Sequence, residues 1–488
     1  MKKSFFALLL AFCFSACMET VTIDEERDKY PDIFPDYTEV TIPPNVAPLN
    51  FRIDEPNITK TDVTIVGQGG KTYHCQSKKE VVIPAAEWND IIGSSVGDTI
   101  VAKVCIKQQE RWVKYKSFPI YISSDSIDYG LSYRLIAPGY EVYSKMGIYQ
   151  RELSSFDQKP IIENTLIPGS CVNCHSYRET NTDDFSIHIR GAKGGTLLKH
   201  HNLLEMLDTK TKETLSSCVY PYWHPSGNYI AYSVNKTQQA FHSADIKRIE
   251  VFDHASDVVI YDVRNHKLIT MDLLKSENNF ETFPAFSPDG KKLYFCSSEA
   301  RQVPGEFKDI KYNLLSVLFD AATGCIGNQV DTLVNARGLG KTVSFPRPSY
   351  DGKFLMFTMF DYGNFSIWHP EADLWMLKLE TGEKFPLENL NSDHTESYHS
   401  WSSNSRWVVF SSRRVNGLYT MPYIGHIDEE GNSTKPFLLP QRSPDFYDQT
   451  FYSFNVPEFI NQAVEIDARS IENKVKAKHK QVTFAKEK

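Results

Sequence analysis

A segment of 13 residues recurs four times in the second half of this chain, and this repeat constrains the fold more than any other feature. The copies occupy residues 221–233, 284–296, 346–358 and 399–411, so their starts are 63, 62 and 53 residues apart. In each copy a short strand pattern leads into a turn of the Ser-Gly, Asp-Gly or Asn-Ser type and then into an apolar strand. A further strand pair follows each copy. Four antiparallel strands per unit, repeated along the chain, predict the blades of a β-propeller.

The repeat resembles the WD-like repeat of TolB-type β-propellers, in which an aromatic residue and Ser-Pro-Asp-Gly-Lys precede an apolar strand that ends in Ser. The resemblance covers about residues 128–465. It implies an all-β fold and says nothing about function. We expect about six blades, with seven as the alternative, because further strand patterns occur at 133–136, 147–151, 185–189, 196–198 and 451–456.

The chain before the propeller carries a different pattern. Residues 37–124 alternate short β runs with turn signals, which predicts a small Ig-like β-sandwich that serves as a spacer and docking module. Cys75 and Cys105 fall in this domain and either pair or stay free. Residues 18–36 are polar and acidic and predict a tether. The Lys-rich residues 466–488 predict a terminal helix or frayed tail.

The N-terminus has the features of a secretory signal. Two lysines precede the apolar residues 5–14, a stretch too short to span a bilayer. Residues 14–17, Phe-Ser-Ala-Cys, resemble a bacterial lipoprotein processing site, which implies that residues 1–17 are a signal peptide with a lipobox and that Cys17 is lipidated. Cleavage after Ala16 by an ordinary signal peptidase is the alternative. Because Met18 rather than Asp follows, we expect a lipid anchor in the outer membrane, with the protein facing the periplasm or the cell surface.

The charge balance limits the choice of partners. The chain has 53 Lys and Arg against 61 Asp and Glu, and the predicted cleavage removes two of the lysines. A net negative protein of this kind is not expected to bind nucleic acid. We expect instead a protein partner, either a redox protein or another component of the envelope.

Residues 171–175 read Cys-Val-Asn-Cys-His, the attachment motif of a c-type haem. The motif predicts one covalent haem c, with thioether bonds to Cys171 and Cys174 and with His175 as the proximal ligand of the iron. A structural disulfide, a redox pair or half of a zinc site are the alternatives, but no βαβ pattern and no second ligand pair accompany the motif. The flanking residues read as turns, so we expect a haem-binding loop at 166–182.

The sixth ligand of the iron stays open at this stage. Met206 would give a Met/His pair, whereas His188, His200 or His201 would give a bis-His iron, and an empty position would permit ligand binding. A second group, His394, His399 and His426, could hold a metal if the fold brought the three together.

These features predict a lipid-anchored monohaem protein of the bacterial cell envelope that transfers electrons or docks a redox partner on a propeller platform. The alternatives are a TolB-like interaction or scaffold protein without a redox role and a haem-dependent reductase or peroxidase. A hydrolase is not expected, because the sequence has no Gly-x-Ser-x-Gly nucleophile elbow and no room for an α/β-hydrolase domain.

Overall fold

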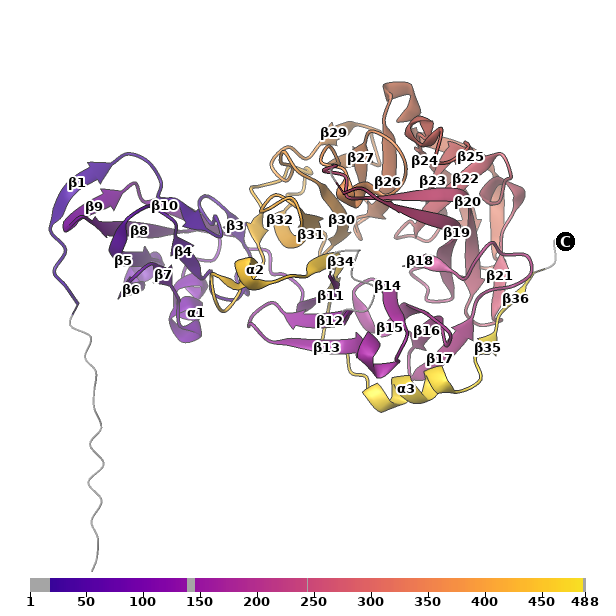
Figure 1. Cartoon of the computed structure of the whole chain (residues 1–488), viewed down its shortest axis with the longest axis horizontal. Coiled ribbons are helices and arrows are strands. Elements are labelled where there is room, and N and C mark those ends of the chain that lie inside the picture. The colour runs from indigo at the N-terminus through magenta and orange to yellow at the C-terminus, as the bar shows by residue number, and fades with distance from the viewer. Residues whose placement is uncertain (1–17, 138–144, 244, 486–488) are drawn as a thin grey trace, which may run out of the picture.

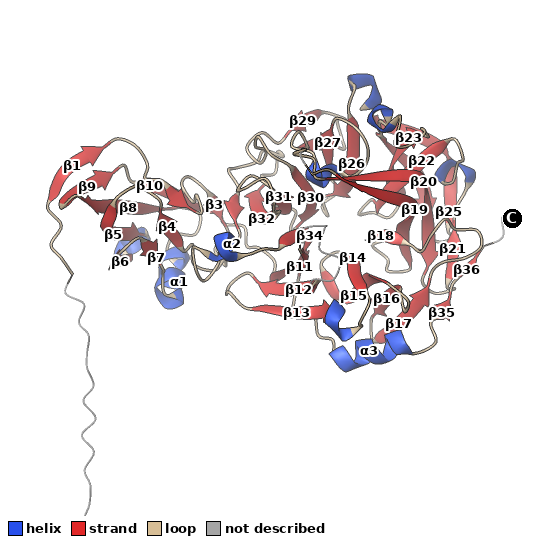
Figure 2. Ribbon diagram, in the orientation of Figure 1, coloured by secondary structure: helices blue, strands red, loops and turns tan. Residues whose placement is uncertain are grey.

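A computed structural model of this chain describes residues 18–137, 145–243 and 245–485. A small N-terminal domain lies beside a larger ring of sheets (Figure 1). Strands dominate both bodies, and the described residues include only three α-helices (Figure 2). The predicted all-β fold is confirmed. The predicted signal peptide and Cys17 lie outside the described residues.

The ring consists of six sheets, each built on four antiparallel strands, as in a β-propeller. The first sheet contains β34 (Ser453–Ile460), β11 (Gly130–Ile136), β12 (Gly147–Glu152) and β13 (Gln158–Glu163). The second contains β14 (Cys171–Arg178), β15 (Asn181–Arg190), β16 (Gly195–His200) and β17 (Leu203–Asp208). The third contains β18 (Val219–Trp223), β19 (Tyr229–Phe241), β20 (Ile249–Asp262) and β21 (Lys267–Ile269).

The other three sheets follow the same order along the chain. The fourth contains β22 (Asn279–Phe286), β23 (Lys292–Glu299), β24 (Asn313–Asp320) and β25 (Cys325–Val334). The fifth contains β26 (Thr342–Pro348), β27 (Phe354–Phe360), β28 (Asp373–Lys378) and β29 (Lys384–Pro386). The sixth contains β30 (Glu396–Trp401), β31 (Trp407–Ser412), β32 (Met421–His426) and β33 (Phe437–Leu438).

Six inner strands form the closed centre of the ring. Contacts run from β14 to β18, β22, β26, β30 and β34 in turn, and β34 contacts β14 again. β34, the last strand of the ring, also pairs with β11, the first, so the two ends of the propeller segment close the ring within one sheet. Each inner strand that begins a repeat copy is therefore held between two neighbouring inner strands at the axis.

A β-bulge recurs in the inner strands and directs side chains to the axis. Tyr220, Phe283, Phe345, Tyr398 and Val456 each occupy such a bulge with φ between 50 and 53°. Positive φ is costly for bulky residues, so the surrounding structure must hold it. The rings of Tyr220 and Phe345, which come from non-adjacent sheets, have centroids 6.2 Å apart. We call Tyr220, Phe283, Phe345 and Tyr398 the axial cluster.

The N-terminal domain has two sheets over one core. The larger sheet contains β1 (Ile23–Arg27), β9 (Arg111–Tyr115), β8 (Thr99–Gln108), β10 (Phe118–Ile122), β3 (Thr41–Ile42), β5 (Ile58–Val66) and β6 (Thr72–Ser77). The smaller sheet contains β2 (Ile33–Phe34), β4 (Phe51–Ile53) and β7 (Glu80–Val81), and α1 (Ala85–Gly93) packs beside them. The same buried core continues into the sixth sheet and α2 (Phe446–Gln449), so the two bodies share one apolar interior.

The prediction that residues 18–36 form a tether is wrong. β1 and β2 lie within this segment and pair with β9 and β4. The side chain of Asp24 accepts a 2.7 Å hydrogen bond from the Trp112 backbone N–H, and Glu26 forms an ion pair with Lys114. The acidic residues therefore form the solvent-exposed side of an edge strand. An edge strand of this kind and a polar linker have the same local pattern of polar residues, so the sequence pattern alone could not tell them apart.

The predicted C-terminal tail is an ordered strap. It contains α3 (Ala468–Lys476), β35 (Lys480–Gln481) and β36 (Thr483–Phe484), and the two short strands pair with β17 and β21. Ile471, Val475 and Val482 are buried, so the strap covers the outer edges of two sheets. Of the helices in the described residues, none has the length and apolar character needed to cross a bilayer.

We predict that Cys75 and Cys105 remain free thiols. They lie on β6 and β8, on either side of β5, where Cys75 pairs with Val63 and Cys105 with Asp62. Consecutive residues of a strand point to opposite faces, so the two thiols face opposite sides of the sheet across about 10 Å. A peptide map under non-reducing conditions should contain both cysteines unlinked, and a Cys75–Cys105 cross-link would contradict this register.

Candidate functional site

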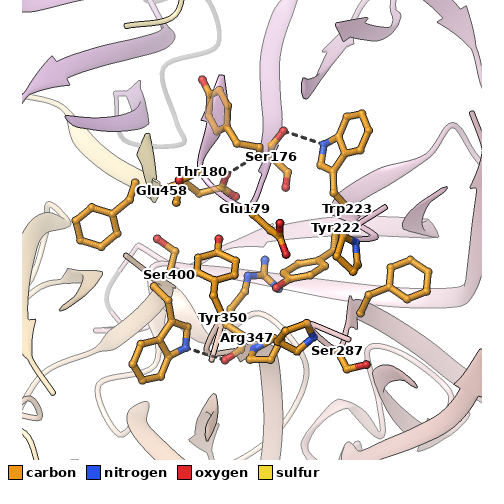
Figure 3. A pocket seen from close by; sticks show the side chains of 17 residues that line it. Ser176, Glu179, Thr180, Tyr222, Trp223, Ser287, Arg347, Tyr350, Ser400 and Glu458 are labelled. Carbon is orange, nitrogen blue, oxygen red and sulfur yellow. Dashed lines mark hydrogen bonds between the residues drawn. The ribbon is translucent and has the colours of Figure 1, made fainter. Parts of the chain in front are cut away.

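Two adjoining cavities lie along the inner strands at the centre of the ring. The axial cavity, of about 80 Å³, is lined by the start of β14 and by members of the axial cluster: Arg134, Asn173, Cys174, His175, Tyr220, Pro221, Phe345, Arg347, Phe365, Tyr398 and Val456. The mouth cavity, of about 30 Å³, is lined by residues further along the same strands (Figure 3). The side chain of Arg347 lines both cavities.

The Cys-Val-Asn-Cys-His motif begins β14, the inner strand of the second sheet. The expected loop at 166–182 is therefore wrong for more than half of its length, because residues 171–178 form β14 and residues 181 and 182 begin β15. A register shift between Val172 and His175 marks a bulge that contains Asn173 and Cys174. This bulge places the motif at the level of the axial cluster.

The two cysteines of the motif are free, half-buried thiols in different surroundings. The Cys171 Sγ lies 3.4 Å from the Sδ of Met146. Cys174 lines the axial cavity together with Tyr220 and Tyr398. Neither thiol is in a disulfide, so both sulfur atoms are chemically available.

His175 is only 3% exposed, and its ring is directed at β11, next to Ser132 and Arg134. Neither ring nitrogen makes a geometrically complete hydrogen bond among the described residues, although the nearby Ser132 backbone partly offsets the fall in the pKa of the ring. Burial lowers the pKa of His175 to about 3, so the imidazole is neutral at physiological pH, the form that binds a metal. A buried polar group without a partner is costly and calls for a ligand or a structural reason.

His399 provides an internal comparison for His175. It lies at the bulge of β30, is 2% exposed, and its ring nitrogens also make no geometrically complete hydrogen bond among the described residues. Other repeat copies have Pro at this position. The fold thus tolerates a buried imidazole ring in an inner strand without any ligand. What distinguishes His175 from His399 is the pair of thiols that precedes it in the sequence.

Three of the four sequence-based candidates for the sixth ligand lie too far from His175. Met206 pairs with Leu197, Leu197 with Ile187 and Ile187 with His175, so three strand spacings of about 4.8 Å separate the two, roughly 14 Å in all. His200 and His201 lie at the far end of β16, where Asp184 accepts hydrogen bonds from the His200 ring and the His201 backbone.

The carboxylate that holds these histidines is already occupied. Asp184 is fully buried and also pairs with Arg178 at 2.5 Å. Although Asp184, His200 and His201 could present ligand atoms to a metal, both carboxylate oxygens have partners within the chain. We therefore interpret this cluster as a structural network that secures the end of β14.

His188 is the nearest of the four candidates, but it lies on the wrong face of the sheet. It is on β15, next to the bulge of β14, and lines a separate cavity with Ser216 and Tyr220. Its neighbour Ile187 pairs with His175 and shares its face, so alternation turns His188 away from His175. In this register none of the four candidates reaches a metal held by His175.

The fold also separates the second group of histidines. His426 binds Asp125 at 2.8 Å in the connection to the N-terminal domain, whereas His399 is buried in β30. No metal-like cluster among the described residues includes either of them or His394. The hypothesis of a metal site at these three residues is wrong.

Sequence reasoning missed Met146, which lies directly before β12 and is 6% exposed. Its sulfur contacts Cys171 although 25 residues separate the two in the chain. No spacing rule connects these positions, because the contact depends on how the first and second sheets pack together.

The mouth cavity has a charged and aromatic lining. Arg347 points into it beside Glu179 and Tyr350, and its guanidinium lies 5.2 Å from the centroid of the Tyr222 ring (Figure 3). Burial raises the pKa of Glu458 to about 7, and its carboxylate accepts a 3.0 Å hydrogen bond from the Tyr177 backbone. The mouth cavity therefore combines charged and aromatic groups in its lining.

Comparisons with known proteins leave the family open. No family model and no curated protein matches this chain. Among solved structures, the chain resembles prolyl oligopeptidase B from Galerina marginata at 10% identity and a TM-score of 0.36, over 63% of this chain and 44% of that one. A DUF4784 family protein from Bacteroides caccae matches at 7% identity and a TM-score of 0.30, over 73% and 95% of the two chains.

A third solved structure is the native arabinanase of Bacillus subtilis, at 10% identity and a TM-score of 0.30, over 55% of this chain and 93% of that one. The chain spans less than half the length of the prolyl oligopeptidase. With TM-scores this low, we base no argument about activity or substrate on these likenesses.

Proposed function

We propose that this chain is a lipid-anchored monohaem protein of the bacterial cell envelope that transfers electrons or docks a redox partner on a TolB-like propeller. Cys171 and Cys174 would bind one haem c through thioether bonds, and His175 would ligate its iron. Cys17 would carry the lipid that holds the protein at the outer membrane, facing the periplasm or the cell surface. The haem supplies reversible one-electron chemistry when it is bound.

The observation that carries this proposal is the donor set at the start of β14. Two free thiols precede a buried, neutral imidazole whose nitrogens make no geometrically complete hydrogen bond in the described part of the chain. Thiol, thiol and neutral imidazole are the groups that a covalent haem requires. The residues present therefore fit the group in their chemistry.

The surrounding residues give this site a suitable environment. Tyr220, Phe345 and Tyr398 form an aromatic wall of the axial cavity and limit the access of water. Arg134 and Arg347 line the same cavity, and neither has an ion-pair partner among the described residues. Each guanidinium can therefore pair with a carboxylate of the porphyrin.

The test is covalent haem in the purified protein. We expect the full chain, made in a host with c-type cytochrome maturation, to gain the mass of one haem and to show a Soret band. The double variant Cys171→Ser, Cys174→Ser should lose both signals. The double variant Cys75→Ser, Cys105→Ser, which removes two free thiols elsewhere, should keep them.

Two results would overturn the proposal: wild-type protein with the bare polypeptide mass, or equal haem in both double variants. The first would favour the alternative of a TolB-like scaffold or interaction protein of the envelope without a redox role.

A further inference from the structure

We propose that a cavity between the second and third sheets binds a small hydroxylated carboxylate of the sugar-acid class, with Arg190 as the residue that recognises its charge. This cavity, of about 250 Å³, is lined by residues of β15, of β19 and of the segment that leads into β18. We call it the inter-sheet cavity. The site needs no haem, so the inference goes beyond the proposed function.

The first support is a cation without a counter-charge. Arg190 is the last residue of β15 and lines the inter-sheet cavity. Its guanidinium forms no ion pair and no hydrogen bond among the described residues. A guanidinium matches a planar carboxylate through two parallel hydrogen bonds. A single cation of this kind favours a ligand that carries one negative charge.

The second support is a buried imidazole in the same lining. His188 is 6% exposed, and neither of its ring nitrogens takes part in a hydrogen bond among the described residues. Burial, and then the charge of Arg190, lowers the pKa of His188 to about 3, so the ring is neutral at physiological pH. A neutral imidazole offers one donor and one acceptor, which a hydroxyl group can meet. The nearby positive charge of Arg190 disfavours a metal ion at this ring.

The third support is an oxygen acceptor whose orientation the fold sets. Asn235 is 8% exposed, and its amide nitrogen donates a 2.9 Å hydrogen bond to Asp253. Asn364, which follows β27 in the fifth sheet, donates to the same carboxylate oxygen. The amide oxygen of Asn235 is left without a partner among the described residues. It can be satisfied only by a donor, which a hydroxyl group has and a bare inorganic anion lacks.

The other polar groups of the inter-sheet cavity suit the same ligand. The hydroxyls of Ser217, Tyr220 and Thr237 line it, and none of them has a hydrogen-bond partner among the described residues. A hydroxyl both donates and accepts, as the hydroxyls of a sugar acid do. A molecule with one carboxylate and several hydroxyls therefore satisfies the cation, the imidazole and the amide oxygen together. An inorganic anion would satisfy the donors alone.

The experiment measures the binding of D-glucuronate to the full-length protein by isothermal titration calorimetry. D-Glucuronamide keeps the ring and hydroxyls without the charge, and inorganic sulfate has charge without a hydroxyl donor, so these are the comparison ligands. The test variant is Arg190→Gln. Arg111→Gln is the matched control, because Arg111 is also exposed and unpaired among the described residues but lies on β9 of the N-terminal domain. Thermal unfolding establishes that both variants are folded.

We expect the wild type and Arg111→Gln to bind D-glucuronate about tenfold more tightly, or more, than either comparison ligand, because a charge-assisted pair is stronger than a neutral hydrogen bond. Arg190→Gln should lose this preference for the acid over the amide. The inference is overturned by wild type that does not bind D-glucuronate, by sulfate of equal affinity, or by undiminished binding in Arg190→Gln. None of these results bears on the proposed function, which the variants of Cys171 and Cys174 test through covalent haem.

Discussion

Replacing His175 by Ala is expected to change the iron spectrum of the proposed haem protein, whereas His399→Ala should leave it unchanged. The two histidines are almost equally buried, and neither ring makes a geometrically complete hydrogen bond among the described residues. His399 lies within the bulge of β30, and His175 directly follows the bulge of β14. They differ in that His175 follows Cys174 and His399 follows Tyr398. If His175 binds iron, the two variants should differ in their iron spectra. If both histidines serve only in packing, the two spectra should be the same.

The measurement is the absorption spectrum in both oxidation states, normalised to covalent haem, together with thermal unfolding of each variant. Both substitutions remove a buried ring, so we expect both to lower the midpoint of unfolding to a similar degree. Only His175→Ala should alter the iron spectrum. Equal spectra for the two variants would show that His175 is a structural residue of the repeat.

The propeller could be predicted from the sequence because each repeat copy joins a turn to an apolar strand. The structure has a turn and a buried strand at each of these positions. It missed β1, whose side chains are nearly all exposed, since a strand without a buried face has no alternation to detect. It also read the motif as a loop. Asn173 and Cys174 occupy a bulge at the axial cavity, where polar residues are tolerated within a strand.

The site was predictable only as far as its local motif. Cys171, Cys174 and His175 are recognised by their spacing, but the residues that surround them come from other parts of the fold. Sequence proximity favoured Met206 and the histidines of β15 and β16, yet strand register moves each of them away from His175. Met146 reaches Cys171 through the packing of two sheets, a relation that no single-sequence pattern encodes.

The second large effect concerns pH: Glu281→Gln should stabilise the protein at pH 9 and leave it almost unchanged at pH 5. Burial, followed by the nearby Asp257 charge, raises the pKa of Glu281 to about 8. One of its carboxyl oxygens has no partner among the described residues, and the residue is fully buried on β22. The native protein therefore keeps this carboxyl protonated at a pH where the unfolded chain has lost the proton.

The direction of this pH effect on stability follows from proton linkage. Between about pH 4.5 and pH 8 the native state binds one more proton at Glu281 than the unfolded state, so the free energy of unfolding falls as the pH rises through this window. Gln cannot ionise and removes this term. By the size of the shift, the free energy of unfolding of the variant should exceed that of the wild type at pH 9 by on the order of 5 kcal/mol.

Urea unfolding at pH 5, 7 and 9 tests this prediction, with Glu277→Gln as the control. Glu277 is exposed and lies four residues before Glu281 in the same region of the chain, so its substitution should change the free energy of unfolding little at any of these pH values. Buried Asp257, whose pKa burial raises to about 6, adds a smaller dependence of the same sign that persists in both variants. A wild-type stability that does not fall toward pH 9, or a Glu281→Gln protein that falls in parallel with it, would mean that Glu281 is ionised in the native interior and has a counter-charge there.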